Sequence, residues 1–564
     1  MQSTLDMARE MILENQAAQA LPILHKQLQT DANDAAAHSL LGYAYAGVGE
    51  IEKGIAHAQR AIALEPEVLA YHIGLAEALL QANRAEESIR NLQGALKLDP
   101  QSAELHVALA NAYYTMQDLV HACEHFKKVL DAVPEAVEIW LRYGIALEKQ
   151  GLLDQATRAF ETSVELDRDF TDAHLRLANQ YLMQNRLAEA VQEFDQCIRC
   201  AAAEKLPNHA QTMAAVYYGK GIACSNRKDT EAATACYRSA IELNPDFALA
   251  HFALSCELLR CGNYVEGWKE FDWHLSDKEF FKPVPGYPQW DGRVAKSKTI
   301  LIIAEQGFGD MIHFSRFVKM VRERVGRVLF LVPHDIAGLM ATLAGPDNVI
   351  TEDPRLFGFD EQITLTRLPR LFEVDICNPP ASIPYLAADP VLVERMRAKM
   401  SGRRGLRVGL VWAGNPKFVV DQHRSIPPAD LAALKYLPVG QWYAMQTKTD
   451  LPPELMWDNM MNLGQDMTDF SITAAIMKNL DLMITVDTSS AHLAGALGIP
   501  VWTIMRYCAD WRWLMDRSDS PWYPTMRLFR PGRVRQWDDV IGQIADGLTH
   551  LARVRQGDTH GGLI

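Results

Sequence analysis

Apolar positions in the first half of the chain recur every 34 residues. Pro66, Pro100 and Pro134 lie at this interval, and small residues such as Ala122 and Ala156 recur with them. Bulky side chains occupy a further position of the repeat: Leu92, Phe126, Phe160, Phe194, then Tyr237 and Phe271. Small residues let two helices approach, an aromatic side chain fills the remaining groove, and proline ends the second helix. The pattern predicts stacked helical hairpins over residues 1–281, in six to eight units.

The period and the residue types match the tetratricopeptide repeat. The spacing also predicts an insertion of nine residues near 201–211, because Ala190 and Ala233 are 43 residues apart. A stack of such hairpins presents an extended concave surface, so we expect this array to bind a polypeptide. Self-association into a homo-oligomer, or simple spacing of domains, are the alternatives.

The pattern changes after residue 281. The segment 282–298 is rich in proline and glycine, which indicates a domain junction. Residues 299–304 form an apolar, β-branched run that predicts a buried parallel strand. An amphipathic helix over 311–324 and a strand over 327–332 follow, which together make a βαβ unit.

The same order restarts with an apolar run at 406–412. A helix over 428–437, strands over 442–445 and 482–486, and a helix from about 491 follow. We therefore expect two Rossmann-like lobes, residues 299–400 and 401–564, with a ligand cleft at the carboxyl ends of their strands. The predicted fold class is an α-solenoid followed by a pair of α/β lobes.

The first predicted strand is followed by a glycine-rich turn that contains Gly307, Gly309 and Asp310. The glycines allow a close approach of the backbone, and the carboxylate would lie at the start of the next helix. Asp310 is either a helix cap or a catalytic base on this evidence, and both readings stay open.

A second polar turn follows the strand at 482–486. It contains Asp487, Thr488, Ser489, Ser490 and His492. Hydroxyl groups and free N–H groups at the start of a helix favour an anion, to which a cation at His492 would add. A simple helix cap is the alternative for one or two of these residues.

Amide and basic side chains come between these two turns in the sequence. Asn415 and Lys417 follow the strand at 406–412, and Arg424 lies shortly after them. These side chains could reach a diphosphate or a sugar, and solvated surface charge is the alternative for each.

These residues resemble a known family. Gly309-Asp310 and the segment 487–500, which reads DTSSAHLAGALGIP, look like signatures of heptosyltransferase-type enzymes. The whole chain resembles bacterial proteins that join tetratricopeptide repeats to such a domain. The resemblance implies a GT-B fold that uses no metal, with Asp310 as general base, the 488–492 turn on the donor phosphate, and 415–417 near the nucleotide. Glu305 and Gln306 depart from the family, which usually has Ser or Thr there, so the donor and acceptor stay open.

The resemblance implies transfer of a sugar from a nucleotide-sugar to a Ser or Thr hydroxyl of a protein held by the repeats. The nucleotide-sugar is a substrate, and no other cofactor is expected. Some repeat-fused relatives glycosylate flagellin with nonulosonic acids, and the protein N-acetylglucosamine transferases share the overall plan. A non-catalytic adaptor is one alternative. A lipid or lipopolysaccharide glycosyltransferase is another, and it would present Trp511, Trp513 and Trp522 to a membrane.

Charge and composition narrow the kinds of partner and cellular location that we expect for this protein. Residues 1–280 carry 24 Lys and Arg against 40 Asp and Glu, a net of −16, while the remainder is +2. An acidic array does not favour nucleic acid, since phosphate binding needs a basic surface. The sequence contains no apolar run long enough to span a bilayer and no secretory signal, so we expect a cytoplasmic protein. Nine scattered cysteines fit this, and the Cys197/Cys200 pair is expected to pack within a helix.

Overall fold

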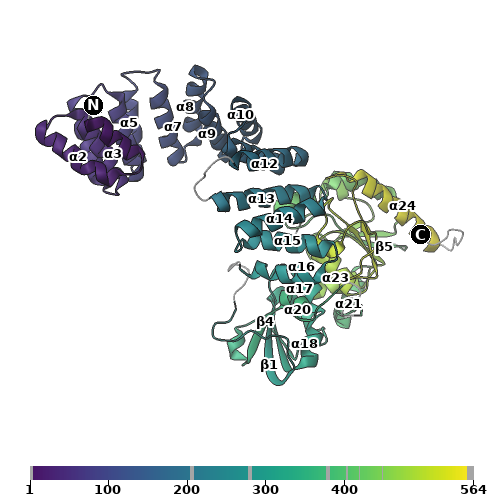
Figure 1. The fold of residues 1–564 in the computed structure, drawn as a ribbon. Helices are drawn as coiled ribbons and strands as arrows, with labels where there is room; N and C mark the ends of the chain where they lie inside the picture. Colours follow the sequence, from purple (N-terminus) through teal and green to yellow (C-terminus); the bar gives the residue numbers. More distant parts are fainter. Residues whose placement is uncertain are drawn as a thin grey trace. The chain divides into compact units, whose positions relative to one another are not determined.

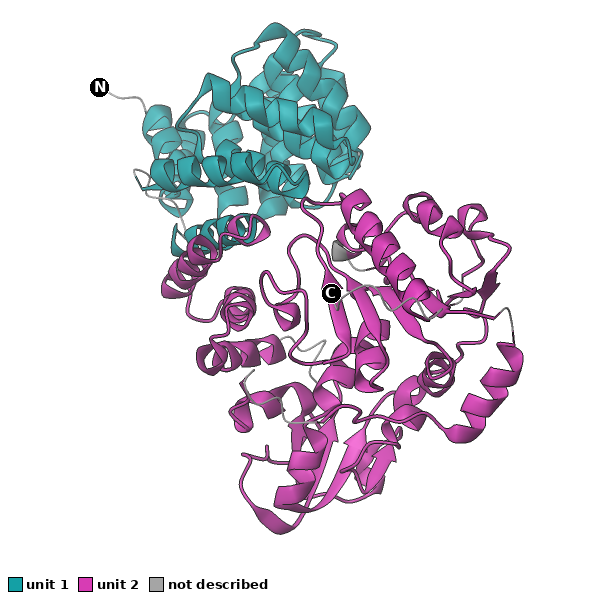
Figure 2. Cartoon of the chain, turned by 90° about the vertical axis from the view of Figure 1, so that its right-hand side faces the viewer, with its two compact units in different colours: residues 1–223 teal, residues 224–564 magenta. Residues whose placement is uncertain are grey.

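The chain divides into two compact units, Met1–Ala223 and Cys224–Ile564 (Figure 2). The computed structural model describes residues 4–202, 209–276, 283–375, 382–401, 404–417, 419–447 and 449–555. Residues 203–208 of the predicted insertion and Lys282 of the predicted junction lie outside the described residues. Helices come first in the chain, and two sheets with shorter helices follow (Figure 1).

Sixteen helices run through the described part of residues 4–271, as a repeat array requires. Their bounds are α1 Thr4–Leu13, α2 Ala17–Thr30, α3 Ala35–Gly47, α4 Ile51–Leu64, α5 Leu69–Gln81, α6 Ala85–Ala95, α7 Ala103–Thr115, α8 Leu119–Ala132, α9 Val137–Lys149, α10 Leu153–Leu166, α11 Thr171–Met183, α12 Leu187–Ala201, α13 His209–Asn226, α14 Thr230–Leu243, α15 Ala248–Arg260 and α16 Tyr264–Phe271. The helix α13 has 18 residues where α3 and α5 have 13, so part of the predicted insertion lengthens this helix.

The turn inside each helix pair reverses the chain through one residue with positive φ. These residues recur with the repeat: Asn15, Gly49, Asn83, Gln117, Gly151, Asn185, Lys228 and Gly262. Glycine and asparagine adopt this left-handed conformation most readily, and it commonly ends a helix. The recurrence is a second periodic signal, independent of the apolar positions.

In the first helix of most pairs, a ring nitrogen atom of a side chain hydrogen-bonds to the turn that precedes the helix. The Nε2 atoms of His72, His106 and His174 lie 2.9, 3.2 and 2.9 Å from the carbonyl oxygen six residues earlier. The Nδ1 atom of the same ring meets a side chain 19 residues later. His106 meets His125 at 2.8 Å, whereas His174 meets Glu193 at 2.6 Å.

The two kinds of partner move the histidine pKa in opposite directions. Burial, and then the neighbouring His106, lower the pKa of His125 to about 4. Burial is the largest single effect on His174 and acts to lower its pKa, but the hydrogen bond to Glu193, the hydrogen bond to the Arg168 carbonyl and the charge of Glu193 together raise it. The repeats should therefore respond to pH through two opposing groups.

The second unit contains two parallel sheets. The strands of the first are β1 Ala295–Ile303, β2 Val325–Leu331, β3 Asn348–Ile350 and β4 Glu361–Thr364, in the order β3-β2-β1-β4. The strands of the second are β5 Arg407–Val411, β6 Gln441–Ala444, β7 Met460–Asn462, β8 Leu482–Val486, β9 Val501–Ile504 and β10 Met526–Phe529, in the order β10-β9-β8-β5-β6-β7. The structure thus confirms parallel sheets after the helical region.

Short helices connect the strands. They are α17 Phe308–Ser315, α18 Val318–Arg324, α19 His334–Met340, α20 Leu368–Leu371, α21 Pro390–Lys399, α22 Phe470–Met477, α23 Ser489–Ala496 and α24 Asp538–Arg555. The expectation of one helix over 311–324 was wrong, because Arg316 and Phe317 separate α17 from α18. The Arg316 Nε–H group donates to the His313 carbonyl at 2.8 Å. This bond occupies a carbonyl that would otherwise accept a backbone hydrogen bond within a continuous helix. The element expected at 428–437 is a 3₁₀ helix, Pro428–Tyr436.

One face of the helix α16 packs into a hydrophobic core that it shares with both lobes of the second unit. Trp268 is 3% exposed, and its Nε1–H donates to the Val374 carbonyl of the first lobe at 2.9 Å. The same ring meets Trp511 of the second lobe edge-on, with centroids 5.1 Å apart. Phe271 contacts Phe314 and Trp511 in the same core. The helix α16 therefore belongs to the same hydrophobic core as the two sheets.

We predict that Trp268→Ala destabilises the second unit by about 3–5 kcal/mol, because it removes a large buried side chain from this core. Val265→Ala is a matched control in the same helix, where the side chain is 88% exposed, and should change stability by less than about 0.5 kcal/mol. Denaturant unfolding followed by circular dichroism measures both changes. Equal effects of the two substitutions would contradict the packing of α16 into this core.

We predict that His125→Gln makes the stability of the first unit less sensitive to acid. The folded state favours neutral His125, so its contribution is present above pH 6.5 and is lost as the pH falls toward about 4.

His174→Gln should change the pH dependence of stability in the opposite direction. A raised pKa stabilises the fold below pH 6.5, and that gain is lost as the pH rises through the folded-state value. Urea midpoints from pH 4 to 8 test both, and an unchanged acid slope in His125→Gln would refute the assignment.

Candidate active site

The turn after β1 is braced by a buried carboxylate. Glu305 accepts hydrogen bonds from the backbone N–H groups of Leu365 and Thr366 at 3.1 and 3.0 Å, and from the Thr366 hydroxyl. Burial raises the pKa of Glu305 to about 7. This strut joins β1 to the segment after β4 and holds the backbone that leads into Gly307. The residue that departs from the heptosyltransferase pattern therefore has a structural role in this chain.

Asp310 is not a helix cap. The residue before α17 is Gly307, which makes no side-chain cap, and Asp310 lies in the first turn of the helix. Its Oδ1 atom accepts a hydrogen bond from the Arg512 guanidinium. The Arg512 side chain is 8% exposed and also donates to Asp510 Oδ1 at 2.7 Å. A part-buried ion pair thus joins the first lobe to the second at Asp310.

The turn before α23 keeps its backbone donors available. Thr488 occupies the cap position without a side-chain cap bond, and its hydroxyl instead lies 3.4 Å from the Val486 carbonyl. The first-turn N–H groups at Ser489 and Ser490 have no carbonyl partner within the helix. These N–H groups, with the two serine hydroxyls, are suited to an anion.

The two turns meet where α17 packs against α23 (Figure 1). A β-carbon on Gly309 would lie 3.1 Å from His492 Cδ2 and 3.6 Å from Ser489 Cα, so a larger residue there would require His492 to shift. We call Gly309, Asp310, Ser489, His492 and Arg512 the interlobe site. The structure therefore brings the two sequence-predicted turns together.

The expectation of a cation at His492 was wrong. The residue is 6% exposed, and burial together with the charge of Arg512 lowers its pKa to about 3. His492 is therefore neutral at pH 7 and supplies no positive charge to an anion.

The remaining predicted residues lie at the same edge of the second sheet with different contacts. Arg424 donates to the Asp487 carbonyl at 2.9 Å and to Asp421 Oδ1 at 2.9 Å, so it braces the turn before α23. Burial, and then the charge of Asp510, raise the pKa of Asp487. Asn415 and Lys417 are exposed, and Asn415 Oδ1 accepts from Lys417 N–H at 3.1 Å. Among the described residues, neither contacts the turn before α23.

Sequence reasoning missed the residues that support the interlobe site. The sequence patterns assigned no role to Arg512 or to Tyr523. The Tyr523 hydroxyl lies 3.0 Å from His492 Nδ1 and 3.2 Å from His313 Nδ1. Arg316, which is 1% exposed, completes this buried group. The signal that could have found them was an arginine or tyrosine inside an otherwise apolar, tryptophan-rich segment.

Trp511, Trp513 and Trp522 are buried at 1%, 0% and 1% exposure. They pack in the core, as expected of most tryptophans, and cannot form a surface that faces a membrane. Cys197 is also buried in a helical core, beside Phe194 and Ala190. The core-packing prediction for Cys197 is confirmed.

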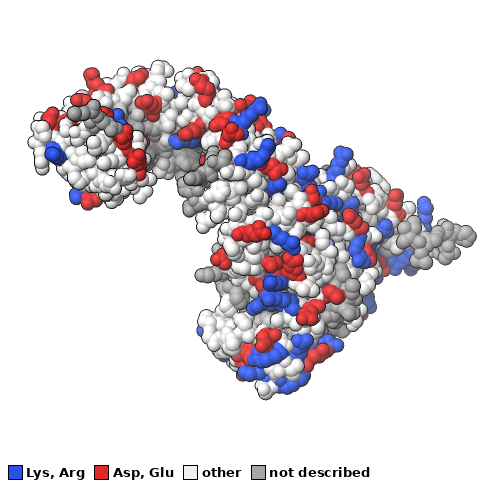
Figure 3. Space-filling view, viewed as in Figure 1, with Lys and Arg blue, Asp and Glu red and all other residues white. Residues whose placement is uncertain are grey.

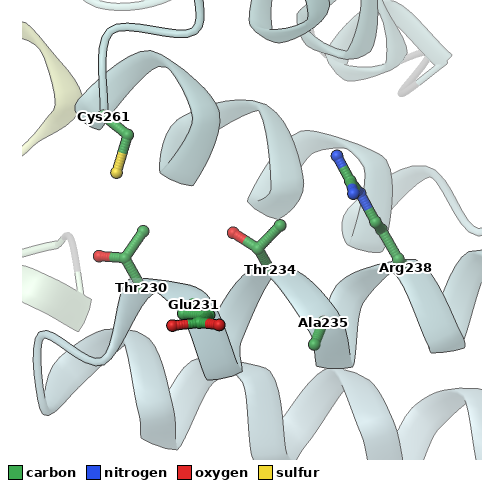
Figure 4. Close-up of a pocket in the computed structure, with 6 residues that line it drawn as sticks. All are labelled: Thr230, Glu231, Thr234, Ala235, Arg238 and Cys261. Carbon is green, nitrogen blue, oxygen red and sulfur yellow. The ribbon is translucent and has the colours of Figure 1, made fainter.

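Other features of the described residues offer less chemistry. Basic and acidic side chains alternate over the visible face of the second unit (Figure 3). An open recess is lined by Thr230, Glu231, Thr234, Ala235 and Arg238 of α14 and by Cys261 (Figure 4). Arg238 there is paired with Glu266 at 2.8 Å. Within the described ranges, no three His, Cys, Asp or Glu side chains are placed to hold a metal ion, and every helix is too short or too polar to cross a bilayer.

Comparison with known proteins identifies the repeats. Models of the tetratricopeptide repeat match residues 76–117, 107–169, 144–205 and 214–247. The chain is 24% identical over 467 residues to Protein FlbA of Caulobacter vibrioides, a match that covers 76% of this chain and 70% of that protein. Since residues 1–281 are only half of the chain, the match extends into the region of the sheets. The prediction of tetratricopeptide repeats is confirmed.

Solved structures of repeat proteins resemble parts of the chain. YrrB, described as a TPR protein with an unusual peptide-binding site, is 24% identical, with a TM-score of 0.30 over 35% of this chain and 96% of its own. PilF of Pseudomonas aeruginosa is 18% identical, with a TM-score of 0.32 over 38% and 95%. The C-terminal part of a TPR protein from Cytophaga hutchinsonii is 13% identical, with a TM-score of 0.37 over 44% and 99%.

We predict that Gly309→Ala destabilises the second unit by about 1–3 kcal/mol, because the new methyl group presses on the His492 ring, which the Tyr523 hydroxyl contacts at 3.0 Å. Gly542→Ala is the matched control. Gly542 is also helical, and a β-carbon there would meet nothing within 4 Å, so this change should stabilise by about 0.5–1 kcal/mol. Denaturant unfolding gives both values. Stabilisation by both substitutions would show that α17 and α23 do not approach as described.

Proposed function

We propose that the chain is a glycosyltransferase that moves a sugar from a nucleotide-sugar to a Ser or Thr hydroxyl of a protein held by its repeats. The two α/β lobes then act as a GT-B pair, and no metal takes part. The observation that carries the proposal is the close approach of Gly309, which precedes Asp310, to Ser489 and His492, together with the pairing of Asp310 with Arg512. One side supplies a carboxylate, and the other supplies N–H groups for an anion.

In this proposal Asp310 accepts the proton of the acceptor hydroxyl as that oxygen attacks the anomeric carbon. Such assistance contributes roughly 10²–10⁴-fold to a rate. Arg512 holds Oδ1 of the carboxylate and leaves Oδ2 for the hydroxyl. Gly307 lies beside Oδ2, since a β-carbon on Gly307 would be 3.5 Å from that oxygen. The carboxylate is thereby oriented before the acceptor arrives.

The departing phosphate gains negative charge when the glycosidic bond breaks. The first-turn N–H groups at Ser489 and Ser490 stabilise that charge without reorganising, because the helix already fixes their direction. Arg424 contributes by holding the Asp487 carbonyl, which keeps this turn in place. The neutral His492 does not share the phosphate charge.

The repeats supply the acceptor. A bound polypeptide tethered to the catalytic lobes reacts at a raised effective concentration, which increases the rate without any new catalytic group. The protein-binding role follows from the repeat family, and the family resemblance points to flagellin as one acceptor class. A nucleotide screen by thermal shift would identify the donor, since a ligand at 100 times its dissociation constant stabilises by about 2.7 kcal/mol.

We predict that Asp310→Asn lowers sugar transfer by about 10²–10⁴-fold while nucleotide affinity and fold are retained. The fold should hold because Asp510 still pairs with Arg512, at 2.7 Å, and the asparagine oxygen can still accept from it. Asp335→Asn is the matched control, since Asp335 is an exposed acid in the first turn of α19, and it should transfer at the wild-type rate. A radiolabelled nucleotide-sugar measures both variants.

The same assay separates the proposal from a non-catalytic adaptor. Undiminished transfer by Asp310→Asn would remove Asp310 from the mechanism. A wild-type protein that binds a polypeptide but neither transfers nor hydrolyses any nucleotide-sugar would instead be an adaptor with degenerate lobes.

A further inference from the structure

Three polar side chains connect the turn before α17 to the 3₁₀ helix Asp272–Ser276, which follows α16. His274 Nε2 lies 3.0 Å from the Thr366 hydroxyl, and the same hydroxyl contacts Glu305 Oε1. At the other side of the ring, His274 Nδ1 lies 2.5 Å from the Phe271 carbonyl oxygen. Thr366 and Glu305 are buried, at 2% and 6% exposure, so their hydrogen bonds have to be made within this chain.

The Phe271 carbonyl fixes the hydrogen at one end of the chain. A carbonyl oxygen only accepts, so His274 Nδ1 carries a hydrogen. The other ring nitrogen, Nε2, then carries a hydrogen when the ring is cationic and a lone pair when the ring is neutral.

The Thr366 hydroxyl has a single hydrogen to share. Among the described residues it has two polar side-chain neighbours, Glu305 and His274. When Glu305 is ionised and His274 is neutral, both neighbours are acceptors, and the hydroxyl can donate to only one of them. The other contact then places two lone pairs against each other without a hydrogen. This state of the chain is one proton short.

One additional proton completes the chain in either of two arrangements. If the proton lies on His274, Nε2–H donates to the Thr366 oxygen and the Thr366 hydroxyl donates to Glu305. If the proton lies on Glu305, the carboxyl O–H donates to the Thr366 oxygen and the Thr366 hydroxyl donates to Nε2. The two arrangements differ by the shift of one hydrogen across each contact and contain the same number of protons.

The charges around His274 act in both directions. Burial is the largest effect and lowers the pKa of His274 below its ordinary value. Its backbone hydrogen bond and the charges of Asp272 and Asp310 act the other way, while Arg367 adds to the lowering. Asp272 is itself paired with Arg367, at 3.4 Å, and with Arg370, which offset its charge.

Burial has the opposite effect on the carboxyl group. It raises the pKa of Glu305 to about 7, against the hydrogen bonds from Thr366 and Leu365. A proton on Glu305 leaves both ends of the chain neutral, whereas a proton on His274 leaves a cation and an anion that have both lost water. The arrangement with the proton on Glu305 is therefore favoured.

We propose that Glu305 carries a proton that joins the turn before α17 to the 3₁₀ helix through Thr366 and His274, and that alkaline pH breaks this connection. Loss of the proton leaves Thr366 with one hydrogen for two acceptors, so one hydrogen bond between the two segments is lost. The turn leads to Gly307 and Asp310, so its support depends on pH. The inference does not depend on the proposed function.

Infrared spectra of the full-length protein test the protonation state. The difference spectrum between wild type and Glu305→Gln at pH 6 should contain the C=O band of one protonated carboxyl group, and this band should disappear by pH 9. Glu352→Gln is the matched control, since Glu352 is an exposed acid of the same lobe and should give no such band. Absence of the band from the Glu305→Gln difference at pH 6 would overturn the proposal.

The pH dependence of stability is a second measurement. Glutamine cannot release a proton, but its amide nitrogen cannot accept from the Thr366 N–H group, so the trend with pH is compared and not the absolute stability. The stability that the proton of Glu305 gives to wild type should be fully present below pH 4.5 and should be lost as the pH rises through about 7. Urea midpoints of wild type and Glu305→Gln that run parallel from pH 4 to 8 would contradict the proposal.

His274 provides a test that needs no substitution of Glu305. Long-range ¹H–¹⁵N spectra of the full chain with labelled histidine should show a neutral His274 with its hydrogen on Nδ1 at pH 6; its signals are identified by their absence in His274→Asn. The Nε2 signal should shift between pH 6 and 9 while Nδ1 keeps its hydrogen, because Thr366 turns its hydrogen toward the ionised Glu305. A cationic ring at pH 6, or an Nε2 signal that does not move, would overturn this inference and leave the proposed function intact.

Discussion

The ion pair between Arg512 and Asp310 is the contact on which the interlobe site depends. Arg512 is almost fully buried, so its charge needs carboxylate partners, and Asp510 of its own segment supplies one. The second partner comes from the other lobe. Burial opposes the charge of Arg512, but Asp510 and Asp310 together raise its pKa. A guanidinium that cannot lose its charge therefore fixes the position of one lobe's carboxylate against the other lobe. The orientation of Asp310 follows from this requirement and not from its place in α17.

The surrounding polar groups are arranged to the same end. Glu305 holds the turn before α17, Arg424 holds the turn before α23, and Tyr523 holds His492. Each acts on a backbone segment or a ring and lies behind the surface where the two helices meet. The aromatic core formed by Trp268, Trp511 and Trp522 includes the ring on which the Arg512 guanidinium lies, with its central carbon 4.3 Å from the Trp511 centroid. Rigid support of this kind is what a site for group transfer requires.

Local patterns were sufficient to predict the repeats, the main strands and the two polar turns. Each depends on spacing within about 34 residues, such as Pro66 to Pro100, or on an apolar run followed by glycine or hydroxyl residues. The partners of these turns could not be predicted, since Asp310 and Arg512 are 202 residues apart in the sequence. The neutral state of His492 depends on burial and on Arg512, and the strut formed by Glu305 depends on a segment 60 residues away. The break between α17 and α18 arises because Arg316 folds back onto its own helix. These features belong to tertiary structure, which periodicity does not record.

The burial of α16 among the sheets has a consequence for how such chains can diversify. Repeats nearer the N-terminus contact mainly their neighbours, so whole units can be duplicated or lost there without disturbing the α/β core. The last pair shares its side chains with the α/β core and cannot be exchanged in this way. New binding partners would then be gained by altering the distal repeats, while the proximal pair is inherited together with the lobes. Lineages built on this plan should vary in array length at one end only.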